Sequence, residues 1–463
     1  MTAPAATNAV RAYVADHVAE LLADLDEWLR IPSISSDPAS APDVRRSAEW
    51  AAERFRRAGF STEVWETGGL PAIYAERLVG PDSPTVVVYG HHDVQPVDPL
   101  ELWETPPFEP TIRGEELFAR GAADDKGQVL FHLLGLEAAL AAHGQIGVNL
   151  KFLVEGEEES GSPNFPDLLR RERDRLRCDV VVVSDTGVWD RDTPTVCTAM
   201  RGLVHCDVDF HGPATDLHSG SFGGAVPNPA TELARLLSRL HDADGHVAVP
   251  GFYDRVERLS ERERALFAAL PFAEDEWLAT AESTATAGEA GFTTLERIWA
   301  RPTAEVNGIS GGYAGPGGKT IVPAKANAKL SFRLVFDQRP AEVIESVTRW
   351  VHDNTPAGIR AEVSWEGQGV KPCLTPLDHP ALQACMTAME RAFDKPCLPM
   401  REGGSGPEAD LAEILEAPVV FLGVGLPDDR IHAPNERVVL PMLYKGAEAA
   451  AYLWEELPKA LRG

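Results

Sequence analysis

The chain has 463 residues, 44% hydrophobic residues, 25% charged residues and a formal net charge of −28. A chain of this length is too long for a single ordinary hydrophobic core, which predicts two domains. The negative charge argues against nucleic acid as a partner. Because no run of about 18 apolar residues occurs, a membrane span is not expected. Residues 1–25 carry Asp16, Glu20 and Asp24, which favours a helix over a signal peptide.

Short apolar runs alternate with helical patterns in the first part of the chain. The runs at 85–89, 148–154 and 180–183 are continuous rather than alternating, as expected of parallel strands that are buried on both faces. The apolar segment 127–143 has the length of a helix and lies between two of these runs. The order predicts an α/β architecture.

The pattern changes near residue 201, where polar and apolar residues begin to alternate. This period is typical of a strand with one solvated face, and it recurs at 327–334 and 359–365. Helical patterns lie between these strands, at 228–241 and 341–352. We therefore predict a first domain made of residues 1–200 and 369–463, interrupted by a smaller α+β domain at 201–368. Residues 249–300 carry no motif that assigns them a further role.

Histidines and carboxylates follow several of the apolar runs. They are His91, Asp124, Asp125, Glu155, Glu157, Glu158, Glu159, Asp185 and His432. Each has an ordinary alternative, because acidic residues are common in solvated turns and at helix N-termini. Their joint occurrence near strand ends favours a dinuclear metal site. Imidazole and carboxylate ligands suit zinc, with manganese or cobalt as alternatives.

Six scattered cysteines form no C-x-x-C pair. This argues against a thiolate zinc site. We interpret them as buried, reduced thiols, which predicts a cytoplasmic protein.

Six motifs carry a resemblance to a known family. They are YGHHDVQPVDPLELWETPPFEP (89–110), RGAADDKGQ (120–128), EGEEESGS (155–162), DLHSG (216–220), GGYAGPGGKTIVPAKA (311–326) and REGGS (401–405). Together they resemble the dinuclear zinc peptidase and deacylase family of aminoacylase, acetylornithine deacetylase and glutamate carboxypeptidase. Within it, the cytosolic non-specific dipeptidases and carnosinases are the most similar branch. Two positions depart from the family pattern, with Ala119 where Gly is frequent and His92 where the dipeptidases often have Tyr.

The resemblance implies a zinc-exopeptidase-like catalytic domain with a mixed, largely parallel sheet, interrupted by a lid domain that forms a homodimer. Carried over by position, it assigns the metal ligands His91, Asp124, Glu159, Asp185 and His432. Asp124 would bridge two ions, with His91 and Asp185 on one and Glu159 and His432 on the other.

The resemblance also suggests roles for residues around the metals. Glu158 would be the general base and later the acid, and Asp93 would orient His91 through its second ring nitrogen. His218 would reach the partner subunit's active site and stabilise the oxyanion. A substrate carboxylate would be held by residues of the lid and of the REGGS motif, namely Arg333, Arg401, Gly403, Gly404 and Ser405.

These assignments predict a metallopeptidase in which a metal-bound hydroxide hydrolyses dipeptides or short peptides with a free C-terminal carboxylate. The alternative is an N-acyl amino acid deacylase of the same family, which needs the same metals and carboxylate contacts. A third possibility, a silent binding protein that keeps the fold, is disfavoured because no ligand position is missing.

Overall fold

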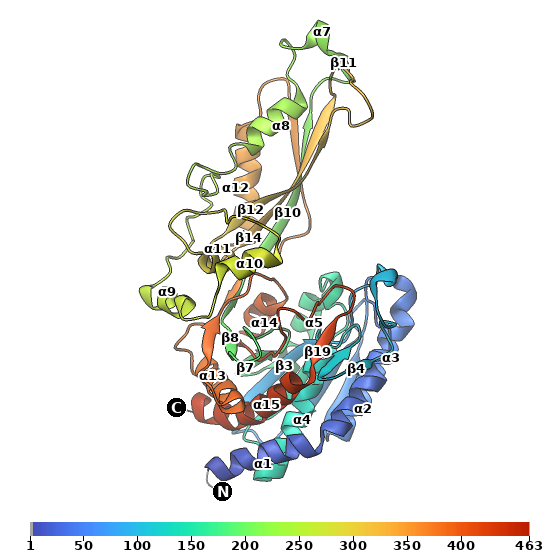
Figure 1. Cartoon of the computed structure of the whole chain (residues 1–463), viewed down its shortest axis with the longest axis vertical. Coiled ribbons are helices and arrows are strands. Elements are labelled where there is room, and N and C mark those ends of the chain that lie inside the picture. The colour runs from blue at the N-terminus through green and yellow to red at the C-terminus, as the bar shows by residue number, and fades with distance from the viewer. Residues whose placement is uncertain (1–2, 463) are drawn as a thin grey trace. The chain divides into compact units, whose positions relative to one another are not determined.

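The computed structural model describes residues 3–462 and forms two compact units (Figure 1). The first unit comprises the chain up to Thr198, then Leu374–Met400 and the chain from Gly406 on. The second unit comprises Ala199–Cys373 and Arg401–Ser405.

The first unit is built around a six-stranded mixed sheet in the order β1-β2-β6-β3-β7-β18. Strands β6, β3, β7 and β18 run parallel to one another, whereas β1 and β2 add an antiparallel edge. The sheet strands are β1 (Ser61–Trp65), β2 (Ala72–Arg77), β3 (Thr85–His91), β6 (Asn149–Glu155), β7 (Val180–Val183) and β18 (Val419–Phe421). Short strands complete the unit: β4 (Thr111–Arg113), β5 (Glu116–Phe118), β8 (Thr195–Cys197), β17 (Leu398–Met400) and β19 (Arg437–Val439).

Helices surround this sheet. They are α1 (Ala3–Asp16), α2 (Val18–Leu29), α3 (Ala41–Arg57), α4 (Lys126–His143), α5 (Phe165–Arg171), α6 (Arg173–Leu176), α13 (Pro380–Phe393), α14 (Glu408–Leu415) and α15 (Leu440–Leu461), with short 3₁₀ turns η1 (Pro38–Ser40), η2 (Leu100–Leu102) and η3 (Glu158–Ser160). Helix α4 is apolar around most of its circumference and packs against α1, α2 and α15, so nearly all of its side chains are buried. This packing fixes the N-terminus of α4 beside the ends of the parallel strands.

The second unit contains a four-stranded antiparallel sheet in the order β12-β14-β10-β15. Its strands are β10 (Gly202–His211), β12 (Thr303–Gly311), β14 (Lys325–Leu334) and β15 (Arg360–Trp365). The residues of β10 alternate between buried and more exposed positions, and helices α8 (Pro229–Leu237) and α12 (Pro340–Asp353) contact the sheet. The remaining elements are β9 (Ala199–Met200), β11 (Leu217–His218), α7 (Ser219–Phe222), α9 (Glu261–Ala268), α10 (Glu274–Thr280), α11 (Thr294–Ala300) and β13 (Ile321–Val322), and β16 (Cys373–Leu374) lies at the boundary of the units.

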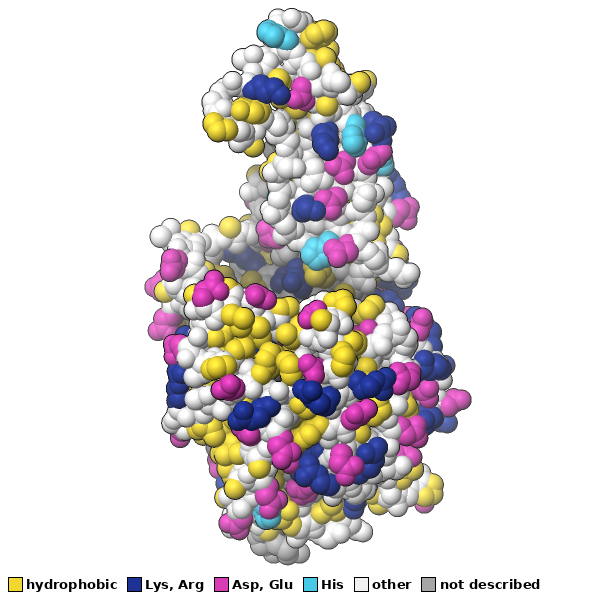
Figure 2. Space-filling view, turned by 90° about the vertical axis from the view of Figure 1, so that its right-hand side faces the viewer, with side chains coloured by type: hydrophobic (Ala, Val, Ile, Leu, Met, Phe, Trp, Pro, Cys, Tyr) yellow, Lys and Arg dark blue, Asp and Glu magenta, His cyan; other side chains and the backbone are white. Residues whose placement is uncertain are grey.

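Three features of the helices, the surface and the cysteines bear on the sequence predictions. None of the helices within residues 3–462 is long and apolar enough to cross a bilayer. On the face seen in Figure 2, acidic and basic side chains of the larger unit are interspersed rather than gathered by sign. All six cysteines are free thiols, and every one except Cys178 is buried.

Candidate active site

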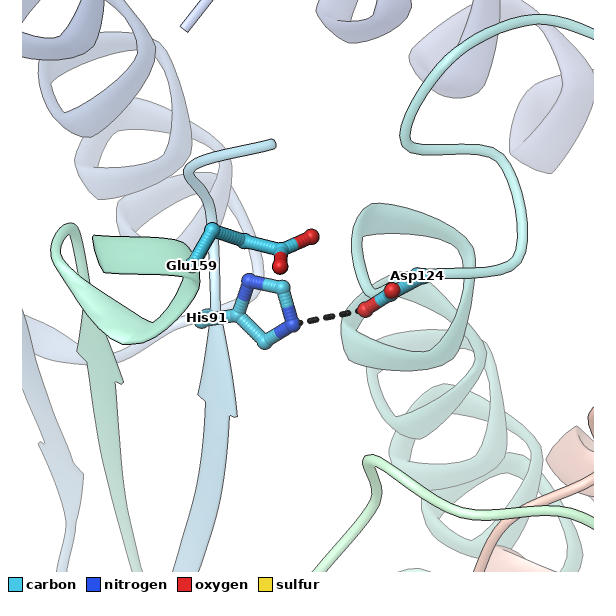
Figure 3. A group of neighbouring side chains, drawn as sticks. All are labelled: His91, Asp124 and Glu159. Carbon is cyan, nitrogen blue, oxygen red and sulfur yellow. Dashed lines mark hydrogen bonds and ion pairs between the residues drawn. The ribbon is translucent and has the colours of Figure 1, made fainter. Parts of the chain in front are cut away.

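Three parallel strands deliver the predicted ligands to one edge of the sheet. His91 is the last residue of β3, Glu159 lies in the η3 turn after β6, and Asp185 follows β7 by two residues. Because parallel strands end at the same edge, these side chains come together. Asp124 reaches the group from the turn that precedes α4, opposite His91 and Glu159 (Figure 3).

Asp124 lies at the centre of the group. Its Oδ1 is 2.8 Å from Nε2 of His91, and its Oδ2 is 2.9 Å from Nε2 of His432. Nε2 of His432 is also 3.2 Å from a carboxylate oxygen of Glu159, and Nε2 of His91 is 3.7 Å from Oδ2 of Asp185. Asp124 thus offers one oxygen to each histidine, which is the arrangement expected of a carboxylate that bridges two ions.

The donor atoms and the local charge both fit divalent cations. Two sets of ligand atoms lie within 4.8 Å of one another: His91, Asp124 and Glu159, and His91, Glu158 and Asp185. Burial, together with the charges of Asp185, Glu159 and Asp124, raises the pKa of Glu158 well above its usual value. So many buried carboxylates repel one another, and cations among them would remove that repulsion.

Asp93 holds two parts of the site in place. Its carboxylate accepts the backbone N–H groups of Glu158 at 3.3 Å and Glu159 at 3.0 Å. Its Oδ1 is 3.5 Å from Nδ1 of His91, and its backbone carbonyl is 3.0 Å from the same nitrogen. Because Nδ1 is engaged in this way, the ring of His91 directs Nε2 toward Asp124. Metal-binding histidines are commonly oriented by such a second partner on the other ring nitrogen. These contacts are the ones that a positioning role of Asp93 requires, and that role stays a prediction.

Sequence reasoning missed Glu436, which ties the Asp124 turn to the His432 loop. Its buried carboxylate accepts Nη1 of Arg120 at 2.7 Å and three backbone N–H groups, those of Gly121 and Ala123 at 3.0 Å and that of Asp124 at 3.2 Å. Glu436 and Arg120 are 316 positions apart in the chain, so the sequence gave no signal that their side chains meet. Gln95 donates to Glu159 at 2.7 Å and was also missed, because these two residues are 64 positions apart.

Replacement of Glu436 by glutamine is expected to destabilise the protein by about 3 kcal/mol, because it leaves the Arg120 guanidinium buried without a counter-charge. The side chains of Arg120 and Glu436 are 1% and 0% exposed. Denaturant unfolding of the metal-free protein measures the change. The matched control is Asp192→Asn at the exposed ion pair with Lys395, for which no measurable loss of stability is expected because solvent screens exposed pairs. Equal effects of both variants would contradict the proposed importance of the buried pair.

The second unit brings together most of the predicted carboxylate-binding residues. Nη1 of Arg333, on β14, donates to Oγ of Ser405 at 2.9 Å. Arg401 instead forms an ion pair with Glu263 at the start of α9. Gly403 and Gly404 accept hydrogen bonds through their carbonyl groups, from Nε and the backbone N–H of Arg201. Contacts with arginines therefore hold the loop 401–405 in place. Arg333, one of the predicted carboxylate-binding residues, contacts this loop through a neutral partner, Ser405.

His218 lies apart from these arginines in the second unit. It ends β11 and caps α7 by accepting the backbone N–H of Gly220 at 3.0 Å through Nδ1. Asp216 fixes the same turn, since it accepts the backbone N–H of Ala324 and pairs with Lys319. His218 is exposed and its Nε2 is available to a ligand from outside the unit.

Comparison with known proteins identifies the family. The model of peptidase family M20/M25/M40 matches residues 87–456. The chain is 31% identical to the human Beta-Ala-His dipeptidase over 94% of this chain and 89% of that protein, and 30% identical to the Cys-Gly metallodipeptidase of Schizosaccharomyces pombe over 92% and 93%.

Solved structures agree with this assignment. An M20 family metallo-carboxypeptidase from Sulfolobus solfataricus has a TM-score of 0.83 at 30% identity, covering 95% of this chain and 99% of that chain. Human carnosine dipeptidase 1 has a TM-score of 0.78 at 30% identity, covering 98% and 99%. The predicted family and fold class are confirmed. The chain belongs to peptidase family M20/M25/M40.

Proposed function

We propose that this protein is a metal-dependent dipeptidase that cleaves the peptide bond of dipeptides with a free C-terminal carboxylate. The observation that carries the proposal is Asp124, which presents one oxygen to each of two histidines within a cluster of buried carboxylates. The similar proteins with named substrates, the Beta-Ala-His and Cys-Gly dipeptidases, act on dipeptides.

The metals would be held by His91, Asp124, Glu159, Asp185 and His432. When bound, two divalent cations polarise a substrate carbonyl and lower the pKa of water. Zinc is the first candidate because the ligands are imidazole and carboxylate.

The remaining steps belong to the protein's own side chains. Glu158 lies beside the ligands and is held by Asp93 through its backbone N–H, so it can accept a proton from water and pass it to the leaving amine. Arg333 holds the substrate carboxylate, because a guanidinium can form two parallel hydrogen bonds to a carboxylate.

A substrate competition tests this function against its alternatives. Zinc-loaded protein is offered Ala-Ala, N-acetylalanine and the pentapeptide of alanine, and free alanine and remaining substrate are quantified. Preferential loss of Ala-Ala is the expected result. Preferential cleavage of N-acetylalanine would establish the deacylase alternative. Preferential cleavage of the pentapeptide would establish a carboxypeptidase, the activity named for the similar Sulfolobus protein.

The second unit is proposed to act as a lid and homodimerisation domain. Strand β12 is an edge strand of its sheet, and Val306 and Ile309 on it are 39% and 67% exposed. An exposed apolar edge strand is suited to pairing with another chain. A cytoplasmic location remains a prediction from the free thiols.

Complementation tests the shared active site of such a dimer. His218→Ala and Glu158→Ala proteins are each expected to be inactive, whereas mixed subunits are expected to recover up to about a quarter of the wild-type activity. The reason is that a heterodimer contains one site with both residues intact if His218 acts on the partner. Subunit exchange is verified by tagging one variant and isolating the heterodimer. An isolated heterodimer without activity would contradict the assignment of His218.

A further inference from the structure

Two arginines lie close together on the polar face of the second unit's sheet. Arg201 directly precedes β10, and Arg333 is on the neighbouring strand β14, where it pairs with Leu203. Since successive residues of a strand point to opposite faces, Arg201 and Leu203 share a face with Arg333. The two guanidinium groups therefore lie diagonally across the same strand pair, within reach of one another.

The hydrogen-bond partners of both guanidinium groups are neutral. Nε of Arg201 donates to the carbonyl oxygen of Gly403 at 3.2 Å, and Nη1 of Arg333 donates to Oγ of Ser405 at 2.9 Å. Among residues 3–462, no carboxylate forms an ion pair with either arginine. Glu305 is close enough to favour the charge of Arg201, but it remains exposed to solvent.

Arg401 differs from Arg201 and Arg333 because it has an acidic partner. Arg401, in the same loop as Gly403, is neutralised by Glu263. Burial and the positive charge of Arg333 lower the pKa of Arg201 to about 10, and burial lowers the pKa of Arg333. Two partly buried cations without counter-ions are unfavourable, and an anionic ligand would relieve this cost.

The loop 401–405 passes close to the side chain of Arg201. A Cβ atom at Gly403 would lie 2.9 Å from Nη2 of Arg201, so a larger residue there would displace the guanidinium. Ser405 also donates to the backbone carbonyl of Arg201. Arg201 is thus held by its backbone and by Nε, which leaves both Nη groups to a ligand.

We propose that Arg201 is a second cationic contact of the substrate site, and that the preferred substrates are dipeptides whose C-terminal residue is Asp or Glu. This inference rests on the proposed dipeptidase function. Arg333 binds one carboxylate of such a residue and Arg201 binds the other. A substrate with a single carboxylate would leave one of the two cations without a partner.

The test compares isosteric substrates that differ in one charge. KM and kcat are measured for Ala-Asp against Ala-Asn, and for Ala-Glu against Ala-Gln, with wild-type protein, Arg201→Gln and Arg201→Lys. The wild-type KM is expected to be about tenfold or more lower for the acidic member of each pair. Arg201→Gln removes this ratio, and Arg201→Lys, which keeps the charge, retains part of it. The control Arg349→Gln, an exposed arginine paired with Glu345 on α12, leaves the ratio as in the wild type.

The possible outcomes separate this inference from the general function. A wild-type ratio near one, or a ratio that survives in Arg201→Gln, overturns the inference while the dipeptidase function stands. An equal rise of KM for both members of a pair in Arg201→Gln also overturns it, because that is the effect of a purely structural arginine. If no dipeptide of any kind is hydrolysed, the proposed function itself fails. Thermal unfolding of each variant verifies that it is folded.

Discussion

Glu158→Gln protein is expected to hydrolyse dipeptides about 10²- to 10⁴-fold more slowly than the wild type, with little change in metal content. Glutamine keeps the size of the side chain but cannot accept and return a proton. The residue adjoins Glu159, a proposed metal ligand, and Asp93 fixes both residues through their backbone N–H groups. Initial rates at saturating substrate give kcat, and elemental analysis of the same sample gives the number of bound ions.

The control for this variant is Asp167→Asn, an exposed carboxylate on α5 paired with Arg170. It is expected to keep the wild-type kcat. Full activity of Glu158→Gln would exclude Glu158 as the proton carrier. Loss of the metals together with activity would instead make Glu158 a ligand, as its grouping with His91 and Asp185 also allows.

Asp124→Ala protein is expected to lose the ability to bind metal at both positions, and with it the peptidase activity. Changes in the outer partners of metal ligands typically cost about 10- to 100-fold in affinity, and loss of a bridging ligand should cost more. Both His91 and His432 would lose the oxygen that now lies within hydrogen-bond distance of Nε2. Titration with zinc, followed by calorimetry, measures the affinity and the number of sites.

The same variant should also be less stable without metal. The Asp124 carboxylate is hydrogen-bonded to His91 and His432, and these contacts raise the pKa of His432 and, despite its burial, that of His91, and lower the pKa of Asp124. Because the substitution leaves the buried His91 without this partner, metal-free Asp124→Ala should unfold at a lower temperature than the metal-free wild type. Zinc raises the Tm of the wild type but not that of the variant. A zinc-dependent rise of equal size in both proteins would contradict the bridging role.

The first unit was predictable from the sequence to a large extent. The continuous apolar runs 85–89, 148–154 and 180–183 correspond to β3, β6 and β7, and the segment 127–143 corresponds to α4. Strands buried on both faces leave a strong hydrophobic signal. Once their parallel order was assumed, the ends of the strands placed His91, Glu159 and Asp185 at one edge of the sheet.

The contacts that hold the site were not predictable in the same way. Glu436 and Arg120 meet only through tertiary folding, since they are 316 positions apart in the chain. Arg201 directly precedes a strand with an ordinary alternating pattern, and its shortage of counter-ions depends on which carboxylates the fold brings near. The motif-free segment 249–300 contains α9 and α11, and each begins with a capping box that the sequence does display, at Ser260 with Glu263 and at Thr293 with Glu296. Those signals predict the starts of the helices but not the ion pair of Glu263 with Arg401.

Metal-dependent dipeptide hydrolysis is tested most directly by adding zinc stepwise to metal-stripped protein while both the bound zinc and the release of amino acids from a dipeptide are recorded. The stripped protein should be folded and inactive, and activity should rise with bound zinc and level off at two ions per chain. Undiminished hydrolysis by the stripped protein, or zinc binding at two ions per chain without hydrolysis of any dipeptide, would contradict it.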